Sequence, residues 1–447
     1  MSLLAGSNTV KGTINDGMDV EFALKLGKTV GKIYGSPVAV AMDGRSSNMM
    51  LKTALVSGIM SVGSDVLDLH AVPTPMIQYF MATHPEVKGG VSITASFAGQ
   101  QINGFRIMKA EGVDDPIFEE HSIEEIMSDN TQVSESQVGE ISVVSDFTEP
   151  YISSILTDVD VEAIRAAGLK ICLDCRNSTV ASTVSQLLMM LSIECIFISG
   201  DSSVLDEDRQ LKLGHVVVSQ GLDLGVAIDM DVDHLLFATA DGIPVHGDKS
   251  FAVFAKDILA KNKGKVVVPV NASTLMESIV RENGGELVLC NVGEQTVIRT
   301  VKETSAVLGG DIFGCIVIPG HACSCDAILA MVKMFEIIAK NGPLGDQISR
   351  YPDYYITRDS ISVPEALIPS VLEAYKSAHD GKEMELQDGV KVYSPEGWIL
   401  VRKSNVRDLI KVYTQSGSRD KSASWLSDTL KELKSILSSL DSSPEPQ

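Results

Sequence analysis

Leu224-Gly-Val-Ala-Ile228 leads directly into Asp229-Met-Asp-Val-Asp233-His234, which carries three carboxylates at alternate positions. The apolar run predicts a buried strand, and alternate side chains of an extended backbone share one face. A tight loop at the end of the strand would bring Asp229, Asp231 and Asp233 to one point. Three like charges at one point repel each other unless a cation neutralises them. Oxygen ligands of this kind favour Mg²⁺ or Ca²⁺.

This loop has two other interpretations. An EF-hand calcium loop begins with the same alternation, but it needs Gly at its sixth position and Glu at its twelfth. These positions hold His234 and Ala240, so the sequence excludes an EF-hand. An acidic turn exposed to solvent, without a ligand, stays open as the alternative. We predict a Mg²⁺ site that holds a phosphate group.

One unit of secondary structure recurs three times along the chain. Each unit consists of an apolar strand, a polar turn, a helix and a second apolar strand, and the units cover residues 38–69, 169–198 and 265–289. Asp43, Asp174 and Asn271 occupy corresponding turn positions. Apolar strands joined through helices form parallel sheets covered on both faces. We therefore predict α/β architecture, with three similar α/β domains in tandem that contain mixed sheets.

The pattern of expected elements changes after Gly342, where polar strands alternate with helices. This predicts an α+β domain at the C-terminal end. Single continuous helices are predicted over residues 117–127 and 149–167. The predicted domains are 1–145, 146–246, 247–343 and 344–441, followed by a disordered tail over 442–447.

Charge and hydropathy restrict the classes of partner. The 447 residues carry a formal net charge of −22, which argues against nucleic acid and anionic membranes as partners. No apolar run approaches the roughly 20 residues that a membrane span requires, and no signal peptide is evident. We expect a cytoplasmic protein that is a monomer or a homodimer.

Seven cysteines in a long chain without a signal peptide predict reduced thiols. Cys172 and Cys175 form a C-x-x-C pair on an apolar strand, where their side chains face opposite sides, so redox or zinc chemistry is not favoured there. A denser set comprises Cys315, His321, Cys323 and Cys325. These residues are either zinc ligands or small residues packed around a helix start, and we favour the second.

Besides the Asp loop, three loops carry candidate functional groups. Ser96 follows a buried strand and becomes a phosphoryl carrier once phosphorylated; otherwise it is a turn serine. Asp311 lies in a glycine-rich loop that we expect to be flexible, and its carboxylate is able to bind sugar hydroxyls. The turn 402–407 offers two arginines, a lysine, a serine and an asparagine, which suit phosphate, although a solvated charged hairpin has the same composition.

Taken in order, these stretches resemble the α-D-phosphohexomutase superfamily, the phosphomannomutases and phosphoglucomutases, from about residue 5 to about residue 437. In the N-terminal third, the motifs that carry the resemblance are Gly6-Ser-Asn-Thr-Val-Lys-Gly12, Val40-Ala-Met-Asp43-Gly-Arg45, Val72-Pro-Thr-Pro75, Ile93-Thr-Ala-Ser96 and Asn103-Gly-Phe-Arg106. Further along they are Asp229-Met-Asp-Val-Asp233-His234, Gly310-Asp-Ile-Phe-Gly-Cys315 and Arg402-Lys-Ser-Asn-Val406.

The resemblance implies four domains around a central cleft and transfer of phosphate between O1 and O6 of a hexose. It implies that Ser96 is the phosphoserine and that Mg²⁺ is bound by Ser96, Asp229, Asp231 and Asp233. Lys11 and Arg106 stand where the family shuttles protons. The resemblance places the hexose phosphate on residues of three loops, namely His234, Asp311, Arg402, Ser404, Asn405 and Arg407.

Several positions depart from the family's pattern. Phe97 replaces the family's His after the phosphoserine, Arg106 replaces Lys and Lys11 replaces Arg, while Phe313 and Cys315 replace sugar-contacting Ser and His. Arginine does not readily release a proton, whereas lysine does. Two functions therefore stay open. The first, which we favour, is an active phosphosugar mutase with altered specificity. The second is a catalytically weak relative that binds a phosphosugar or a protein partner.

Overall fold

The computed structural model describes residues 4–5, 9–95, 101–128, 130–145, 147–175, 178–199, 205–405 and 408–441. The chain forms two compact units, one made of Met1–Phe254 with Phe313–Gln347 and the other of Ala255–Ile312 with Ile348–Gln447. Each unit is described by itself. Among the described helices, none is both long and apolar enough to span a membrane.

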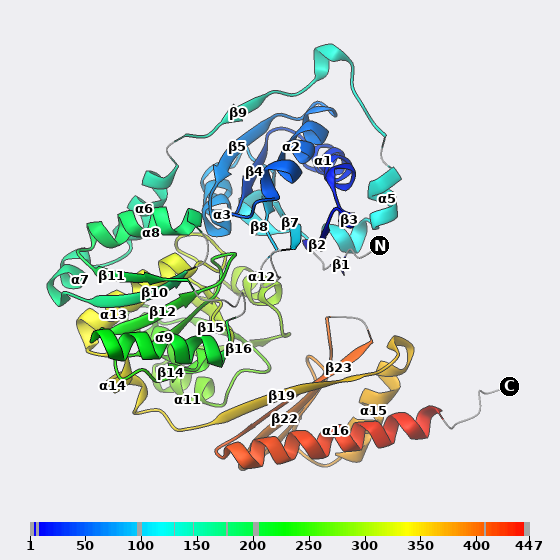
Figure 1. The fold of residues 1–447 in the computed structure, drawn as a ribbon. Coiled ribbons are helices and arrows are strands. Elements are labelled where there is room, and N and C mark those ends of the chain that lie inside the picture. The colour runs from blue at the N-terminus through cyan, green and yellow to red at the C-terminus, as the bar shows by residue number, and fades with distance from the viewer. Residues whose placement is uncertain are drawn as a thin grey trace. The chain divides into compact units, whose positions relative to one another are not determined.

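The first sheet of the first unit has the order β1-β2-β7-β6-β4-β5-β9, with β3 beside β2 and β8 beside β7 (Figure 1). The central strand β4 is parallel to both β5 and β6. Helices α1 (Val20–Tyr34) and α2 (Asn48–Met60) pack on it through one apolar core. The strands are β1 (Leu4–Ala5), β2 (Thr9–Ile14), β3 (Gly17–Met18), β4 (Val38–Met42), β5 (Val66–Ala71), β6 (Gly89–Ile93), β7 (Ile102–Lys109), β8 (Val113–Asp114) and β9 (Ile141–Val143).

Helices α1 and α2 cross at glycines, where a Cβ atom on Gly58 would lie 2.1 Å from the Leu24 carbonyl oxygen. Because that neighbour is backbone, it cannot rotate away, and Gly58→Ala should reduce the free energy of unfolding by about 1–3 kcal/mol. Urea titration of both proteins measures this difference. Gly345→Ala is the matched control, since its added Cβ would meet only side-chain atoms at 3.6 Å or more. An equal effect of the two substitutions would contradict close packing at the crossing.

The second sheet has the order β11-β10-β12-β13-β14. Strand β10 (Lys170–Cys175) is parallel to β11 (Glu194–Ile198) and β12 (Leu224–Ile228), whereas β13 (Leu235–Thr239) returns antiparallel to β12 and is followed by β14 (Pro244–Val245). Figure 1 shows α9 lying along this sheet, where it packs on β10, β12 and β13. Helix α3 (Thr74–Thr83) packs instead on β4 and β6 of the first sheet. The other helices of this part of the unit are α6 (Thr148–Thr157), α7 (Val161–Ala167), α8 (Ser178–Met190), α9 (Glu207–Gln220) and α13 (Ala327–Asn341).

In the second unit, β15 (Lys265–Pro269) is parallel to β16 (Glu286–Cys290) and β17 (Leu308–Gly310), with α11 (Leu275–Glu282) and α12 (Glu294–Thr304) between them in sequence. The last sheet is antiparallel, in the order β19-β23-β22-β21-β20, and buries one face against α15 (Ile368–Ala378) and α16 (Arg419–Asp441) (Figure 1). Its strands are β19 (Tyr355–Ser362), β20 (Met384–Glu385), β21 (Val390–Ser394), β22 (Gly397–Lys403) and β23 (Leu409–Ser416).

The predicted α/β class is therefore confirmed. All three repeated units place the first strand between two parallel neighbours, in β5-β4-β6, β11-β10-β12 and β16-β15-β17. The shared strand order follows from one repeated strand–helix–strand pattern in the sequence. The α+β texture after Gly342 corresponds to the antiparallel sheet with its two helices.

Two helices predicted to be continuous are interrupted, and capping residues explain both interruptions. Residues 117–127 form α4 (Ile117–Glu120) and α5 (Ile123–Ser128), because Ser122 and Glu125 make a reciprocal capping box, with N–H to side-chain distances of 3.2 and 2.9 Å. Residues 149–167 form α6 and α7, because Asp160 caps the Ala163 N–H at 3.1 Å. The glycine-rich loop around Asp311 was predicted to be flexible. Its first part instead belongs to the buried strand β17, and Asp311 is buried as well.

Candidate active site

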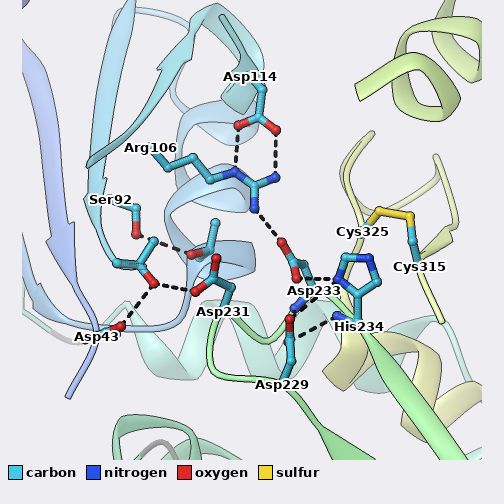
Figure 2. Close-up of polar contacts among 12 residues, drawn as sticks. Asp43, Ser92, Arg106, Asp114, Asp229, Asp231, Asp233, His234, Cys315 and Cys325 are labelled. Carbon is cyan, nitrogen blue, oxygen red and sulfur yellow. Dashed lines mark hydrogen bonds and ion pairs between the residues drawn. A yellow bond between two sulfur atoms is a disulfide. The ribbon is translucent and has the colours of Figure 1, made fainter. Parts of the chain in front are cut away.

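The Asp loop connects β12 to β13 and is curled by its own backbone hydrogen bonds (Figure 2). Asp229 Oδ1 accepts the N–H groups of Asp233 and His234 at 3.1 and 3.2 Å, and the Asp229 N–H donates to the His234 carbonyl at 3.2 Å. Val232 has a φ of +66°, which is strained for a β-branched residue. Its carbonyl accepts the Ala327 N–H at 3.0 Å from the start of α13, which holds the curl in place.

This curl gathers three possible metal ligands. One atom from each of Asp229, Asp233 and His234 lies within 4.8 Å of the others, and all three residues are buried. His234 Nδ1 is 2.7 Å from Asp233 Oδ1 and 3.5 Å from Asp229 Oδ2. Asp229 Oδ2 has no hydrogen-bond partner among the described residues. A buried carboxylate oxygen without a donor costs free energy, and a divalent cation would satisfy it. The residues present therefore fit a Mg²⁺ ion.

The charges within this group are strongly interdependent. Burial, and then the charge of Asp233, raises the pKa of Asp229 to about 8. Burial opposes the charged form of His234, but the carboxylates of Asp233 and Asp229 outweigh it and hold the pKa of His234 well above its usual value. Burial also opposes the ionisation of Asp233, yet His234 and Arg106 hold the pKa of Asp233 well below its usual range. These shifts all arise from packing several ionisable groups together in a buried site.

Asp231, the middle carboxylate, is turned toward a different segment (Figure 2). The Thr94 hydroxyl donates to Asp231 Oδ1 and is also 3.0 Å from Asp43 Oδ2. Burial, followed by the charge of Asp233, raises the pKa of Asp231, while the positive charge of Lys11 acts against that rise. Asp43 is fixed by Asn48 Nδ2 at 2.6 Å. Since Thr94 follows β6 directly, the segment that leads to residue 96 lies against the Asp loop.

Arg106 on β7 joins the Asp loop to the first sheet through a buried ion-pair network. Its guanidinium donates to both Asp114 oxygens at 2.8 and 2.6 Å and also to Asp233 Oδ2 (Figure 2). The Arg106 and Asp114 side chains are almost completely buried. An arginine fixed by three charge-assisted bonds neutralises its partners and keeps its protons. The positive charge of Arg106 therefore lies against two buried carboxylates of this network.

Cys315 and Cys325 form a disulfide with a Cα–Cα distance of 5.4 Å, so the prediction that all the cysteines are reduced is wrong for this pair. The segment folds back on itself, with Cys315 opposite His234 and Cys325 opposite Val317 in isolated β-bridges, and this contact depends on the fold rather than on sequence spacing. Disulfide-bonded sulfurs are not available as zinc ligands. Burial raises the pKa of Cys172 to about 11, which disfavours a reactive thiolate in the C-x-x-C pair.

The second unit contains the basic turn after β22. Arg402 is buried and donates to Asp388 Oδ2 at 2.8 Å and to Asn405 Oδ1 at 3.0 Å. Ser404 is buried as well, and its N–H donates to the Leu409 carbonyl at 2.9 Å. Lys411 on β23 lies directly opposite Arg402 on the neighbouring strand β22. Burial and the neighbouring charges of Arg402 and Arg358 lower the pKa of Lys411, so this face concentrates positive charge as an anion site requires.

Comparison with known proteins adds independent information. Residues 2–134 match the family model for phosphoglucomutase/phosphomannomutase alpha/beta/alpha domain I, and residues 246–354 match that for alpha/beta/alpha domain III. A phosphoglucomutase/phosphomannomutase of Thermococcus kodakarensis is 30% identical over 458 residues, which cover 98% of this chain and 100% of that protein. The chain belongs to the phosphoglucomutase/phosphomannomutase family.

Other members of the superfamily are similar over the same length. A phosphoglucosamine/phosphogalactosamine mutase of Sulfurisphaera tokodaii is 28% identical over 98% of this chain and 99% of its own. The crystal structure of a phosphoglucomutase/phosphomannomutase family protein from Burkholderia thailandensis has a TM-score of 0.85 at 23% identity and covers 96% of this chain and 97% of its own. At that identity the structural likeness concerns the fold.

The predicted site residues of this phosphoglucomutase/phosphomannomutase family member fall into two groups. The first unit brings together six of them, which are Lys11, Arg106, Asp229, Asp231, Asp233 and His234. The second unit contains Asp311, Arg402, Ser404 and Asn405. Asp311 is buried at the end of β17. Burial, and then the charge of Asp311, raises the pKa of Cys290 to about 12. Ser96, Phe97 and Arg407 lie outside the described residues.

Several residues that support the site were not predicted from the sequence. Asp114 and Asp388 are the counter-ions of Arg106 and Arg402, and Thr94 links Asp231 to Asp43. Thr94 and Asp43 stood inside two of the quoted motifs, which was a usable signal. Asp114 and Asp388 had no such signal, because carboxylates in a polar stretch are usually solvated.

Proposed function

We propose that this protein is a phosphohexomutase that moves phosphate between O1 and O6 of a hexose or hexosamine phosphate. The observation that carries the proposal is the contact between Thr94 and Asp231, which sets the segment preceding Ser96 against three buried carboxylates. Phosphoryl transfer depends chiefly on positioning and on neutralising charge. A phosphoserine beside a divalent-cation site would satisfy both requirements. The full-length similarity to curated mutases supports the same reaction class.

In this proposal Ser96 carries the phosphoryl group and gives it to the sugar, forming a hexose 1,6-bisphosphate. The other phosphate of that intermediate then returns to Ser96. Asp229, Asp231 and Asp233 would hold Mg²⁺, which when bound would neutralise the charge of the transferred phosphoryl group. His234 and Arg106 balance the charge of these carboxylates.

Residues of the second unit are proposed to bind phosphate and sugar hydroxyl groups. Arg402, Ser404, Asn405 and Arg407 would hold the phosphate that is not being transferred, and Arg407 would add a second guanidinium. Asp311 would accept hydrogen bonds from sugar hydroxyls. The proposed domains, 1–145, 146–246, 247–343 and 344–441, are supported by the way each sheet falls largely within one of these ranges.

A catalytically weak phosphosugar-binding relative is the second candidate. It is favoured by the geometry of Arg106, whose guanidinium is committed to Asp114 and Asp233 and is therefore not a ready proton carrier. A mutase of this kind would need another group, such as Lys11, to manage the proton of the sugar hydroxyl.

An isomerisation assay distinguishes the two functions. Mannose, glucose and glucosamine 1-phosphates are incubated with the protein, Mg²⁺ and a trace of the matching 1,6-bisphosphate. We expect turnover of at least one of them, and a loss of about 10³-fold or more in Ser96→Ala because the phosphoryl carrier is removed. Ser360→Ala, at an exposed serine, is the control. Phosphosugar binding without turnover in the wild type would favour the second candidate, and activity retained by Ser96→Ala would refute the assigned carrier.

A further inference from the structure

A buried guanidinium lies directly behind the Asp loop, and neither the sequence motifs nor the proposed reaction assigns it a role. Arg209 is in the first turn of α9, where Asp206 caps its N–H at 2.9 Å. Its Nε donates to Asp174 Oδ2 at 2.6 Å, and its Nη2 donates to the Ile228 carbonyl at 2.9 Å. The side chains of Arg209 and Asp174 are almost fully buried, so their ion pair is shielded from solvent.

The position of these contacts in the sheet is specific. Strands β10 and β12 are parallel neighbours, with Asp174 opposite Ala227 and Cys175 opposite Ile228. Asp174 and Ile228 therefore lie where the two strands end. One guanidinium links these two ends at the point where β12 passes into the Asp loop. Such a planar fork of donors is suited to joining a carboxylate and a carbonyl at once.

The Ile228 carbonyl and the Asp229 N–H belong to the same peptide unit, and both are held. Arg209 binds the oxygen, while the N–H donates to the His234 carbonyl at 3.2 Å. A peptide plane held on both sides resists rotation, which restrains the backbone from which the Asp229 side chain projects. The Asp229 carboxylate is then held through Oδ1 by the Asp233 and His234 N–H groups. Asp174 also neutralises Arg209, so the buried guanidinium does not repel a cation bound at the Asp loop.

We propose that Arg209, paired with Asp174, is a positioning residue that orients Asp229 for binding the divalent cation. The inference rests on the proposed function only in taking the Asp loop as a cation site. It predicts that loosening the pair weakens cation affinity even in a protein that remains fully folded. Residues that orient metal ligands from behind typically change metal affinity by about 10–100-fold when they are replaced.

The test is Mg²⁺ binding by isothermal titration calorimetry on the full chain, after EDTA treatment. Arg209→Lys keeps the charge but cannot bind Asp174 and Ile228 together, and we expect its Kd for Mg²⁺ to rise about tenfold or more. Hydrogen exchange at the Asp233 and His234 amides should accelerate, because Asp229 Oδ1 accepts both. The control is Arg165→Lys, since Arg165 also donates to a backbone carbonyl, that of Met190, but is partly exposed.

A purely structural role predicts a different result, in which Arg209→Lys lowers the melting temperature and leaves the Kd for Mg²⁺ unchanged. That result would overturn the proposal. Asp174→Asn decides the question if Arg209→Lys does not fold, since it keeps an oxygen acceptor for Arg209 and removes only the charge. A folded Asp174→Asn protein with the wild-type Kd would also overturn the proposal. Absence of Mg²⁺ binding by the wild type would instead refute the cation site itself, and the proposed function with it.

Discussion

Asp229→Asn is expected to abolish Mg²⁺ binding and to reduce mutase turnover by about 10³-fold, equivalent to about 4 kcal/mol of transition-state stabilisation. Within the described part of the Asp loop, Asp229 Oδ2 is a buried carboxylate oxygen without a hydrogen-bond partner, so it has much to gain from a cation. The amide of asparagine removes the negative charge and keeps one oxygen to accept the Asp233 and His234 N–H groups. The Asp loop should therefore keep its conformation while losing the Asp229 carboxylate that would coordinate the cation.

The pH dependence provides a second measurement on the same variant. The folded protein holds the Asp229 proton up to a pH of about 8, whereas a carboxyl in the unfolded chain loses it near 3.8. Because the unfolded state releases this proton first, the stability of the metal-free wild type should fall as the pH rises between these values. Mg²⁺ must displace the proton, so its affinity should rise with pH toward about 8. Asp229→Asn should remove both of these contributions.

Asp208→Asn is the control for this comparison, because Asp208 is an exposed carboxylate in the same unit. It should bind Mg²⁺ and turn over substrate as the wild type does. Thermal unfolding with and without Mg²⁺ then separates the effects, since we expect Asp229→Asn to lose only the Mg²⁺-dependent increase in melting temperature. A variant that still binds Mg²⁺ with the wild-type Kd would exclude Asp229 as a ligand.

Local signals in the sequence were sufficient for the repeated strands and helices. Strand β4 begins at Val38, where the first predicted unit begins. The helix before it, α1, is framed by Asp19, which caps the Phe22 N–H at 2.9 Å, and by Gly35. Helix α9 was not predicted, although Asp206 and the acidic residues of its first turn were a usable start signal. The sequence of α9 is largely polar, so the side of the helix that packs on the second sheet does not stand out as an apolar pattern.

The arrangement of the site was only partly predictable, because it depends on contacts between distant segments. Alternate spacing predicted that the three Asp side chains would converge, yet the curl at Val232 groups His234 with Asp229 and Asp233. Asp231 turns to Thr94, which lies 137 positions away along the chain. No spacing rule within the loop contains that partner. The disulfide joins cysteines only 10 positions apart, but its geometry depends on how the segment after β17 folds back.

Arg106→Gln is expected to produce the largest loss of stability, about 3–5 kcal/mol in the free energy of unfolding. The substitution removes the guanidinium from buried Asp114 and Asp233 and leaves His234 beside Asp233, and glutamine cannot replace three charge-assisted bonds. Urea titration at neutral pH measures the loss. Adding Asp114→Asn to this variant should restore part of it, since one buried negative charge is then removed. Arg165→Gln breaks the exposed pair with Glu162 and should cost less than about 1 kcal/mol. If the two arginine substitutions cost the same, the network around Arg106 does not contribute the electrostatic stabilisation inferred from its burial.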